Sequence, residues 1–263
     1  MESVKLEIQP SGVAKVVLNR PEKKNSFNTE MIERLWEIAD MIIRNPEIRV
    51  VTLTGEGDFF CAGADLGWMK ERTQRAPEQY SRDAWELAHM LNAWYEIPVP
   101  VLSGVQGGAF GGGLGLVVLS DEVIGVNDAK FSFSEVKLGL IPATISPYVQ
   151  RTLGNKIGNR FLFSGRLFTV QEAKKVGLVD EIVALEELDS VILQKSLLYL
   201  EGSPSAVRAT KKLFRGLGEQ ITEQTIEKTV EALLKVWASK EAEEGVRSYF
   251  LKTKPSWSLK KNQ

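Results

Sequence analysis

The sequence predicts an α/β fold followed by a helical C-terminal region. Three observations support this: apolar residues alternate with polar ones near the N-terminus, glycine-rich loops twice connect an apolar strand to a helix, and strand patterns end before residue 200. We expect a mixed core over residues 1–200 and a helical region over residues 201–263. A chain of 263 residues is long enough to bury a sizeable core.

The first 50 residues predict a hairpin and a helix. Apolar residues at positions 4, 6 and 8, and again at 14, 16 and 18, indicate two strands around a turn at Pro10, Ser11 and Gly12. Asn28 or Thr29 can cap the helix that follows. Its expected apolar face consists of Ile32, Leu35, Trp36, Ala39, Ile42 and Ile43.

The central part alternates strands, loops and helices, and the end is helical. The expected strands occupy residues 50–54, 99–103, 123–126 and 130–133, and the expected helices include residues 84–94, a helix beginning near Leu66, and residues 114–119. The pattern turns increasingly helical from residue 154. From Ser203 and Pro204, a cap and a first-turn proline, only helices are expected, to about residue 251.

Composition excludes several kinds of function. One Cys excludes an internal disulfide framework and a Cys-cluster metal site, and one His excludes the two-His metalloprotease motif. A net charge of −1 argues against nucleic acid as the main partner. We expect no metal and no cofactor.

The sequence also bears on location. Residues 1–10 lack the apolar core of a signal peptide, so with a single Cys we expect a cytoplasmic protein. Residues 97–120 carry no charge and are long enough to span a bilayer. They contain seven glycines and two prolines, however, which favours a buried strand, turn and helix and argues against a membrane span.

Two strand–glycine–helix units are the most informative pattern. Residues 50–54 lead through residues 60–65 toward a helix, and residues 99–103 lead through the glycine-rich residues 107–113 into another. Helix N-termini present unpaired N–H groups, so two of them converging on one oxygen would form an oxyanion hole without His or Lys. The glycines would equally suit close packing of a helix on a sheet. The spacing matches neither a dinucleotide-binding nor a phosphate-loop motif.

Several segments in the same order resemble the crotonase (enoyl-CoA hydratase/isomerase) superfamily. They cover nearly the whole chain and comprise residues 19–28, 60–66, 107–115, 131–142 and 165–183, with the tail around Lys252. The resemblance implies a spiral of β-β-α turns with a helical trimerisation region, and a homotrimer or dimer of trimers. It also implies a coenzyme A thioester as substrate, whose carbonyl the backbone N–H groups of Ala64 and Gly112 would hold.

The resemblance also implies residues that contact coenzyme A. Lys24 matches a position that meets its phosphate or adenine, and Lys252 matches a basic residue that reaches the 3′-phosphate of coenzyme A in a neighbouring subunit. Tyr249 is a weaker candidate for stacking on the adenine. The oxyanion segment supplies the remaining candidates, which are Ala62, Asp65 and Leu66.

Hydratases of this family commonly use two glutamates, and only one matches here. Glu135 occupies the position of the second, whereas Gly115 occupies that of the first. One carboxylate can take a proton from water and return it to carbon, so we expect hydration of a 2-enoyl-CoA. An isomerase or a decarboxylase remains an alternative. Together with residues 65–69, the segment around and after Glu135 resembles most the methylglutaconyl-CoA hydratase-like branch of leucine and isoprenoid breakdown.

Two further hypotheses assign the protein to other functional classes. A non-catalytic homo-oligomer that binds coenzyme A or RNA is one, although no interleaved basic and aromatic patch supports RNA binding. A serine–histidine pair using His89 is the other, but no Gly-x-Ser-x-Gly motif accompanies it. Cys61 is expected to be a small buried residue beside the oxyanion segment.

Overall fold

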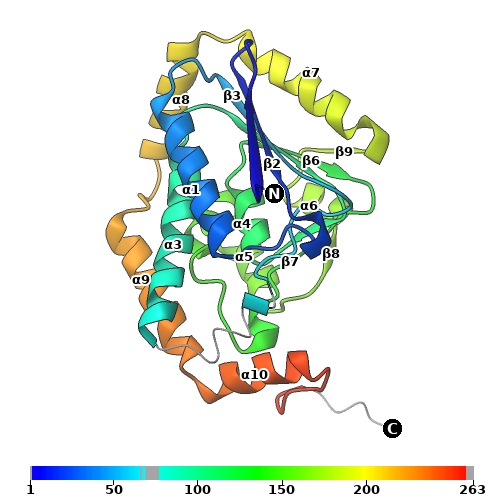
Figure 1. Cartoon of the computed structure of the whole chain (residues 1–263), viewed down its shortest axis with the longest axis vertical. Coiled ribbons are helices and arrows are strands. Elements are labelled where there is room, and N and C mark those ends of the chain that lie inside the picture. The colour runs from blue at the N-terminus through cyan, green and yellow to red at the C-terminus, as the bar shows by residue number, and fades with distance from the viewer. Residues whose placement is uncertain (1, 66, 69–76, 259–263) are drawn as a thin grey trace.

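Two sheets form the centre of the molecule (Figure 1). The computed structural model describes residues 2–65, 67–68 and 77–258. The larger sheet has the order β1-β2-β3-β4-β6-β9, antiparallel at the first pair and parallel elsewhere. Its strands are β1 (Val4–Ile8), β2 (Val13–Leu18), β3 (Val50–Gly55), β4 (Val101–Val105), β6 (Glu122–Val126) and β9 (Glu181–Val183).

A smaller sheet lies beside the first and has the order β5-β7-β8. Its strands are β5 (Gly108–Phe110), β7 (Lys130–Ser132) and β8 (Phe168–Thr169). An isolated parallel bridge between Cys61 and Ala109 adds the segment after β3 to this layer. Strands β3, β4 and β6 are thus each followed by a short segment in the second layer, which confirms the expected spiral of β-β-α turns.

The N-terminal hairpin is confirmed, as is the cap of the first helix. Val16 lies opposite Leu6 in β1 and Leu53 in β3. The side chain of Asn28 accepts a hydrogen bond from the N–H of Met31, so Asn28 caps α1 (Thr29–Arg44). The expected apolar face needs a correction at its edges, because Trp36 is 49% exposed and Ile43 is 37% exposed. The buried face is formed by Met31, Ile32, Leu35, Ile38, Ala39 and Ile42.

Several expected boundaries move in the structure. Strand β4 covers residues 101–105, two residues later than the predicted 99–103, because two prolines precede it. Helix α4 (Gly112–Val118) begins inside the glycine run. The predicted helical pattern after residue 154 is interrupted by β8 and β9, which are only two and three residues long. The helix expected at Leu66 falls partly outside the described residues, although Gly67 and Trp68 are helical.

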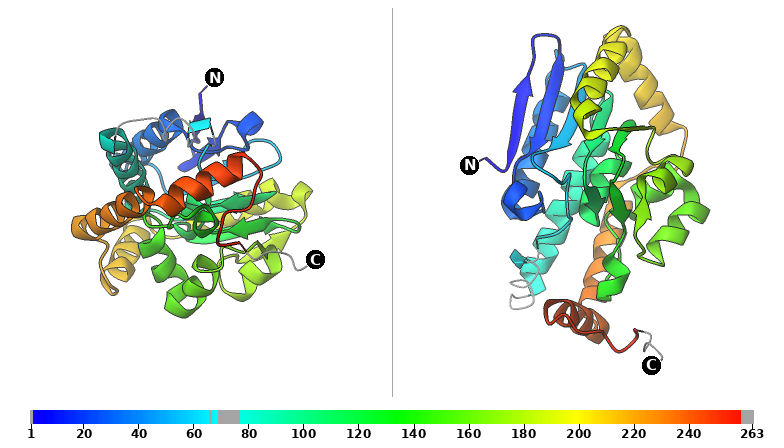
Figure 2. Two further views of the ribbon diagram at one scale, coloured as in Figure 1. Left: turned by 90° about the horizontal axis from the view of Figure 1, so that it is seen from below. Right: turned by 90° about the vertical axis from the view of Figure 1, so that its right-hand side faces the viewer.

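Helices surround the two sheets, and the last of them ends at Phe250. They are α3 (Pro77–Glu96), α5 (Ser146–Leu162), α6 (Val170–Lys175), α7 (Leu188–Leu200), α8 (Pro204–Gly216), α9 (Glu223–Trp237) and α10 (Lys240–Phe250), and η1 (Pro21–Lys23), η2 (Glu135–Leu138) and η3 (Leu185–Glu187) are short 3-10 turns. Helix α9 runs beside α3, and α10 contacts η2 (Figure 1). Seen from below, α10 crosses the end of the core (Figure 2).

The contact between α10 and η2 is made by backbone. A Cβ on Gly245 would collide with the carbonyl oxygen of Leu138, and a Cβ on Gly139 would lie 2.5 Å from the carbonyl oxygen of Glu241. Leu140, Ala242 and Val246 fill the rest of this contact. The C-terminal helix therefore rests directly on the turn that begins with Glu135. No helix among the described residues has the length and apolar character needed to cross a membrane.

Candidate active site

A cavity of about 370 Å³ lies between the two glycine turns, η2 and the C-terminal helices. Its walls are mainly apolar, and residues from α1, α3 and α9 close it on one side. Large apolar residues on these walls include Phe27, Ile32, Trp68, Leu87, Leu233 and Trp237. Glu135 is the one carboxylate among the described residues that line it.

The two glycine turns meet at the cavity, backbone against backbone. A Cβ on Gly63 would lie 2.8 Å from the carbonyl oxygen of Phe110, and a Cβ on Gly113 would lie 2.5 Å from the sulfur of Cys61. Hydrogen bonds from the N–H of Phe110 to the carbonyl of Cys61 (3.0 Å) and from the N–H of Cys61 to the carbonyl of Gly108 (3.3 Å) join the turns. Glycine is needed here because the segments approach too closely for side chains.

Ala64 and Gly112 line the cavity, and their backbone N–H groups find no acceptor among the described residues. Phe27 bridges the peptide groups on both sides of Ala64, donating to the carbonyl of Gly63 (2.7 Å) and accepting from the N–H of Asp65 (2.8 Å). In a parallel bridge the N–H of the intervening residue points the other way. Gly112 is the first residue of α4, where an N–H has no partner within the helix.

The carboxylate of Glu135 lies beside Gly111. A Cβ on Gly111 would lie 3.1 Å from its Oε1 atom, and Gly111 immediately precedes Gly112. The Oε2 atom is enclosed and receives no hydrogen bond from a described residue. Burial raises the pKa of Glu135 to about 7, so the group can hold or release a proton near neutral pH.

The position of the missing glutamate contains no room for a side chain. A Cβ on Gly115 would lie 2.6 Å from Cγ2 of Ile145 and 3.3 Å from Cδ2 of Leu91. Ile145 lines the cavity, whereas Gly115 lies behind it. The cavity wall in front of Gly115 is therefore hydrocarbon at the point where a second carboxylate would enter.

Of the predicted ligand residues near the first turn, some line the cavity and others do not. Ala62 lines the cavity. Lys24 is exposed outside it, with its Nζ 5.5 Å from the ring centre of Phe59 and its carbonyl accepting a hydrogen bond from Ala62 (2.9 Å). Leu66 lies outside the described residues.

Asp65 is buried, and its carboxylate binds protein groups. Arg20 Nη2 lies 3.1 Å from its Oδ2 atom, and the N–H groups of Gly67 and Trp68 donate to its Oδ1 atom. Burial alone would raise the pKa of Asp65, but these hydrogen bonds outweigh it and hold the pKa below its usual value. Asp65 does not line the cavity, although Ala64 before it does.

The C-terminal candidates lie at the cavity of their own chain. Tyr249 lines it with a half-exposed ring, as do Thr253 and Pro255. Lys252 is exposed between them, with a left-handed backbone (φ 54°). A role of Lys252 and Tyr249 in binding coenzyme A, in this subunit or a neighbouring one, stays a prediction.

The surroundings of Cys61 and His89 indicate that both residues have a structural and not a catalytic role. Burial raises the pKa of the Cys61 thiol to about 12, so this sulfur is protonated and unreactive at neutral pH. His89 Nε2 lies 3.1 Å from Glu223 Oε1, where it links α3 to α9. Within the described part of the chain, no group of three or more His, Cys, Asp or Glu residues could hold a metal ion.

Some cavity residues could not be identified from the sequence. Leu233 and Trp237 stand four residues apart on α9, a spacing that predicts a shared face but not what the face covers. Trp68 is 8% exposed and its indole N–H donates to Thr29 Oγ1 (3.1 Å). The sequence marks Trp68 only as part of residues 65–69, which contribute to the family resemblance but do not show that this side chain reaches the cavity.

Comparison with known proteins identifies the family. A model described as enoyl-CoA hydratase/isomerase matches residues 8–260. The hydroxycinnamoyl-CoA hydratase-lyase of Pseudomonas fluorescens is 31% identical over 85% of this chain and 82% of its own length. A solved enoyl-CoA hydratase from Shewanella pealeana has a TM-score of 0.78 at 35% identity, covering 97% of this chain and 96% of that one. Another, from Mycobacterium avium, has a TM-score of 0.86 at 27% identity, covering 98% and 100%. The chain therefore belongs to the enoyl-CoA hydratase/isomerase family, within the crotonase superfamily.

Proposed function

We propose that the protein adds water to the double bond of a 2-enoyl-CoA thioester. The N–H groups of Ala64 and Gly112 would bind the thioester oxygen, and Glu135 would be the acid/base group. Glu135 supports this most, because it is the one carboxylate among the described residues that line the cavity, lies beside Gly111 and has a pKa near neutrality. The substrate contains coenzyme A, so this reaction needs no separate cofactor.

The proposed reaction proceeds in two proton transfers. Ionised Glu135 removes a proton from water, the hydroxide bonds to the β-carbon, and the electron pair of the double bond moves toward the thioester. The resulting enolate oxygen is stabilised by the two N–H dipoles, an effect for which a single donor is typically worth roughly 10²–10³ in rate. Protonated Glu135 then returns its proton to the α-carbon. Because one group acts at both carbons, the hydrogen and the hydroxyl should add to the same face.

A panel of enoyl-CoA esters in heavy-oxygen water tests the reaction. Hydration incorporates the label into the β-hydroxyl, which mass spectrometry detects. Glu135→Gln should lower kcat by about 10³-fold or more while ester binding is retained, since the amide cannot accept the proton. Glu172→Gln is a suitable control, because Glu172 pairs with Arg166 outside the cavity. Near-normal turnover of Glu135→Gln would refute the proposal.

A second candidate is an enoyl-CoA isomerase. The packing of Ile145 and Leu91 against Gly115 favours it, because a single carboxylate is sufficient to move a proton between two carbons of the acyl chain. A decarboxylase would use the same oxyanion site. In the same panel, a shift of the double bond without label incorporation would identify an isomerase. Release of CO₂ without label incorporation would identify a decarboxylase.

The acyl group and the assembly are finer parts of the proposal. The panel should include methylglutaconyl-CoA, an aryl enoyl-CoA and dehydroadipyl-CoA, since relatives carry the names hydroxycinnamoyl-CoA hydratase-lyase and 2,3-dehydroadipyl-CoA hydratase. We propose Lys24, Tyr249 and Lys252 as contacts of the coenzyme A portion. We also propose a homotrimer or a dimer of trimers, which sedimentation would test.

A further inference from the structure

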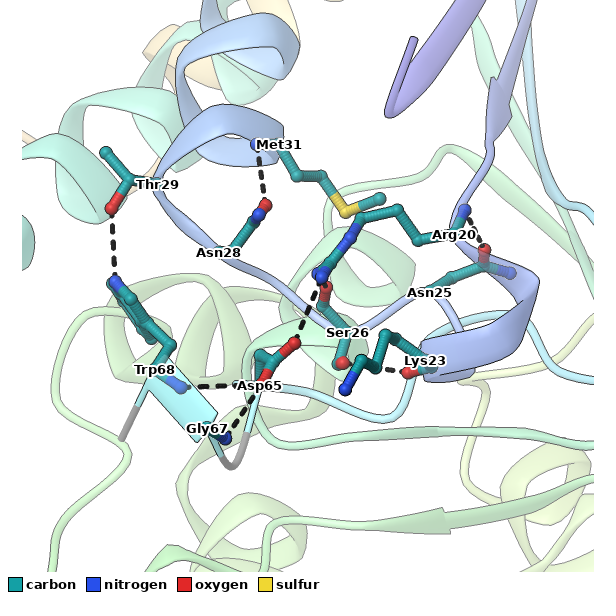
Figure 3. Close-up of polar contacts among 10 residues, drawn as sticks. All are labelled: Arg20, Lys23, Asn25, Ser26, Asn28, Thr29, Met31, Asp65, Gly67 and Trp68. Atoms are coloured by element: carbon teal, nitrogen blue, oxygen red, sulfur yellow. Dashed lines mark hydrogen bonds and ion pairs between the residues drawn. The ribbon is translucent and has the colours of Figure 1, made fainter. Parts of the chain in front are cut away.

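An ion pair behind the cavity connects two segments that shape it. The guanidinium of Arg20 lies between them, with Nη2 3.1 Å from Asp65 Oδ2 and Nη1 donating to the carbonyl of Ser26 (2.6 Å) (Figure 3). The two side chains are only 16% and 11% exposed, and neither lines the cavity. They join residues 20–28, which lead into α1, to the turn that carries Ala64.

The other oxygen of Asp65 holds the turn after Ala64. Its Oδ1 atom accepts hydrogen bonds from the N–H of Gly67 (2.8 Å) and, at longer range, from that of Trp68 (3.4 Å). The indole of Trp68 lines the cavity and its N–H donates to Thr29 at the start of α1 (Figure 3). Asp65 thus connects the fixed guanidinium of Arg20 to a cavity wall.

The same ion pair helps to fix the direction in which the N–H of Ala64 points. The backbone of Phe27 holds the peptide groups on both sides of Ala64, and the ion pair holds the side chain of the next residue. Both attachments come from residues 20–28. Any rotation of residues 63–65 relative to that segment would move the Ala64 N–H away from the thioester oxygen.

A buried ion pair is a weak source of net stability, because losing water around both charges offsets much of their attraction. The pair can instead contribute by holding the backbone and side chains near the cavity in exact positions. A misplacement of about 1 Å can cost roughly 10²-fold in rate when a site depends on prealigned dipoles.

We propose that Arg20 and Asp65 are positioning residues, which align the N–H of Ala64 and the indole of Trp68 with a bound thioester without touching it. This inference rests on the proposed function only in requiring a thioester in the cavity. It does not require that the reaction be hydration.

The test measures carbonyl polarisation separately from turnover. The probe is an aryl-conjugated enoyl-CoA, whose absorption moves to longer wavelength when hydrogen bonds polarise its carbonyl. In Asp65→Asn and in the more conservative Arg20→Lys, we expect the wavelength shift of the fully bound probe to fall markedly and kcat to fall about 10²-fold. KM should change less than about 3-fold, since most substrate contacts remain.

Asp121→Asn is the matched control. Asp121 also pairs with a cation, Lys211, and accepts a backbone hydrogen bond, from Val101 (2.8 Å), but it lines a second cavity that shares no residue with the first. The Asp121→Asn variant should have a lower melting temperature, and its wavelength shift and kcat should be those of the wild type.

Each outcome of this experiment has a distinct meaning. A full wavelength shift and normal kcat in folded Arg20→Lys, with only the melting temperature lowered, would overturn the positioning role. If Asp65→Asn fails to fold, the result for Arg20→Lys decides. A shift in the wild type without hydration would refute the proposed reaction but still permit this test. No shift in the wild type would overturn both.

Discussion

Glu135 combines a carboxylate oxygen without a described hydrogen-bond donor and a position beside Gly111. Burial raises its pKa to about 7, because the ionised form loses more hydration than the hydrogen bond from its own backbone replaces. Its position lets the proton that it carries reach the carbon beside the polarised carbonyl. A base with a pKa near the working pH is efficient, since it is ionised and still basic enough to take a proton from water.

The first prediction concerns the pH dependence of this residue. The reaction starts from ionised Glu135, so kcat/KM should rise with pH through an apparent pKa near 7 and level off above it. Initial rates with one enoyl-CoA between pH 5 and 9 would measure this. A profile that is already flat from pH 5 would show that Glu135 is ionised throughout, as expected for a solvated carboxylate, and would contradict the burial argument.

How well each site residue can be predicted from sequence depends on how local its signal is. Ala64, Gly112 and Glu135 each belong to a short segment whose residue types are characteristic, and the structure brings all three to one cavity. Trp237 also reaches that cavity, but through the packing of α9 on α3. Nothing within α9 specifies that partner.

At the scale of elements, α10 controls the surroundings of Glu135. It rests on η2 through Gly245, where a Cβ would collide with the carbonyl oxygen of Leu138. A backbone carbonyl cannot change rotamer to make room, so any side chain at this position must move α10 away from η2. Water would then approach the glutamate.

The second prediction follows from this contact. Gly245→Ala should destabilise the protein by about 1–3 kcal/mol through overpacking and should shift the rise of kcat/KM below pH 7, because added hydration lowers the pKa of Glu135. Gly216→Ala is the control, since Gly216 is also helical but a Cβ there would meet nothing within 4 Å. It should be neutral or stabilise by up to about 1 kcal/mol. Thermal melts and pH profiles of both variants would measure these effects, and equal behaviour would refute the proposed contact.

The elements that sequence patterns did not reveal are the short ones. Strands β5, β8 and β9 have two or three residues each, which is usually too few for an alternation of apolar and polar positions to stand out. Strand β7 is equally short but was expected, over residues 130–133. The short strands form because neighbouring segments present unpaired backbone groups, which is a tertiary effect. The long elements, such as α1 and β3, repeat their pattern often enough to be predicted.

At the scale of the whole molecule, the fold class could be predicted and the placement of the C-terminal helices could not. Alternating strands and helices indicate an α/β core whatever the details of their contacts. The apolar faces of α9 and α10 show that these helices pack against something, but equivalent faces could cover this chain or another copy. The structure places both on the chain's own cavity.

The third prediction concerns global stability and its dependence on pH. The pKa of Glu135 is about 7 in the folded protein and 4.5 ordinarily, so the folded state binds the proton more tightly. The stability that this residue contributes is therefore complete below about pH 4.5, falls between pH 4.5 and 7 as the unfolded state ionises first, and stays constant above pH 7. In Glu135→Gln the side chain at this position does not ionise, so its contribution to stability does not fall over this pH range.

Glu135→Gln should consequently gain stability relative to the wild type as the pH rises from 4.5 to 7, reaching about 1–3 kcal/mol once solvent access to part of the residue is considered. For a chain of this length each kcal/mol corresponds to about 2–4 °C in melting temperature. Melting curves of both proteins at equal concentration across this pH range would measure the difference. Glu172→Gln is the control, because hydrogen bonds from Arg166 and Thr169 lower the pKa of Glu172, so this variant should show no such gain in stability. A stability difference that is constant with pH would show that Glu135 keeps its ordinary pKa, and would remove the physical basis for its role as the single acid/base group of the cavity.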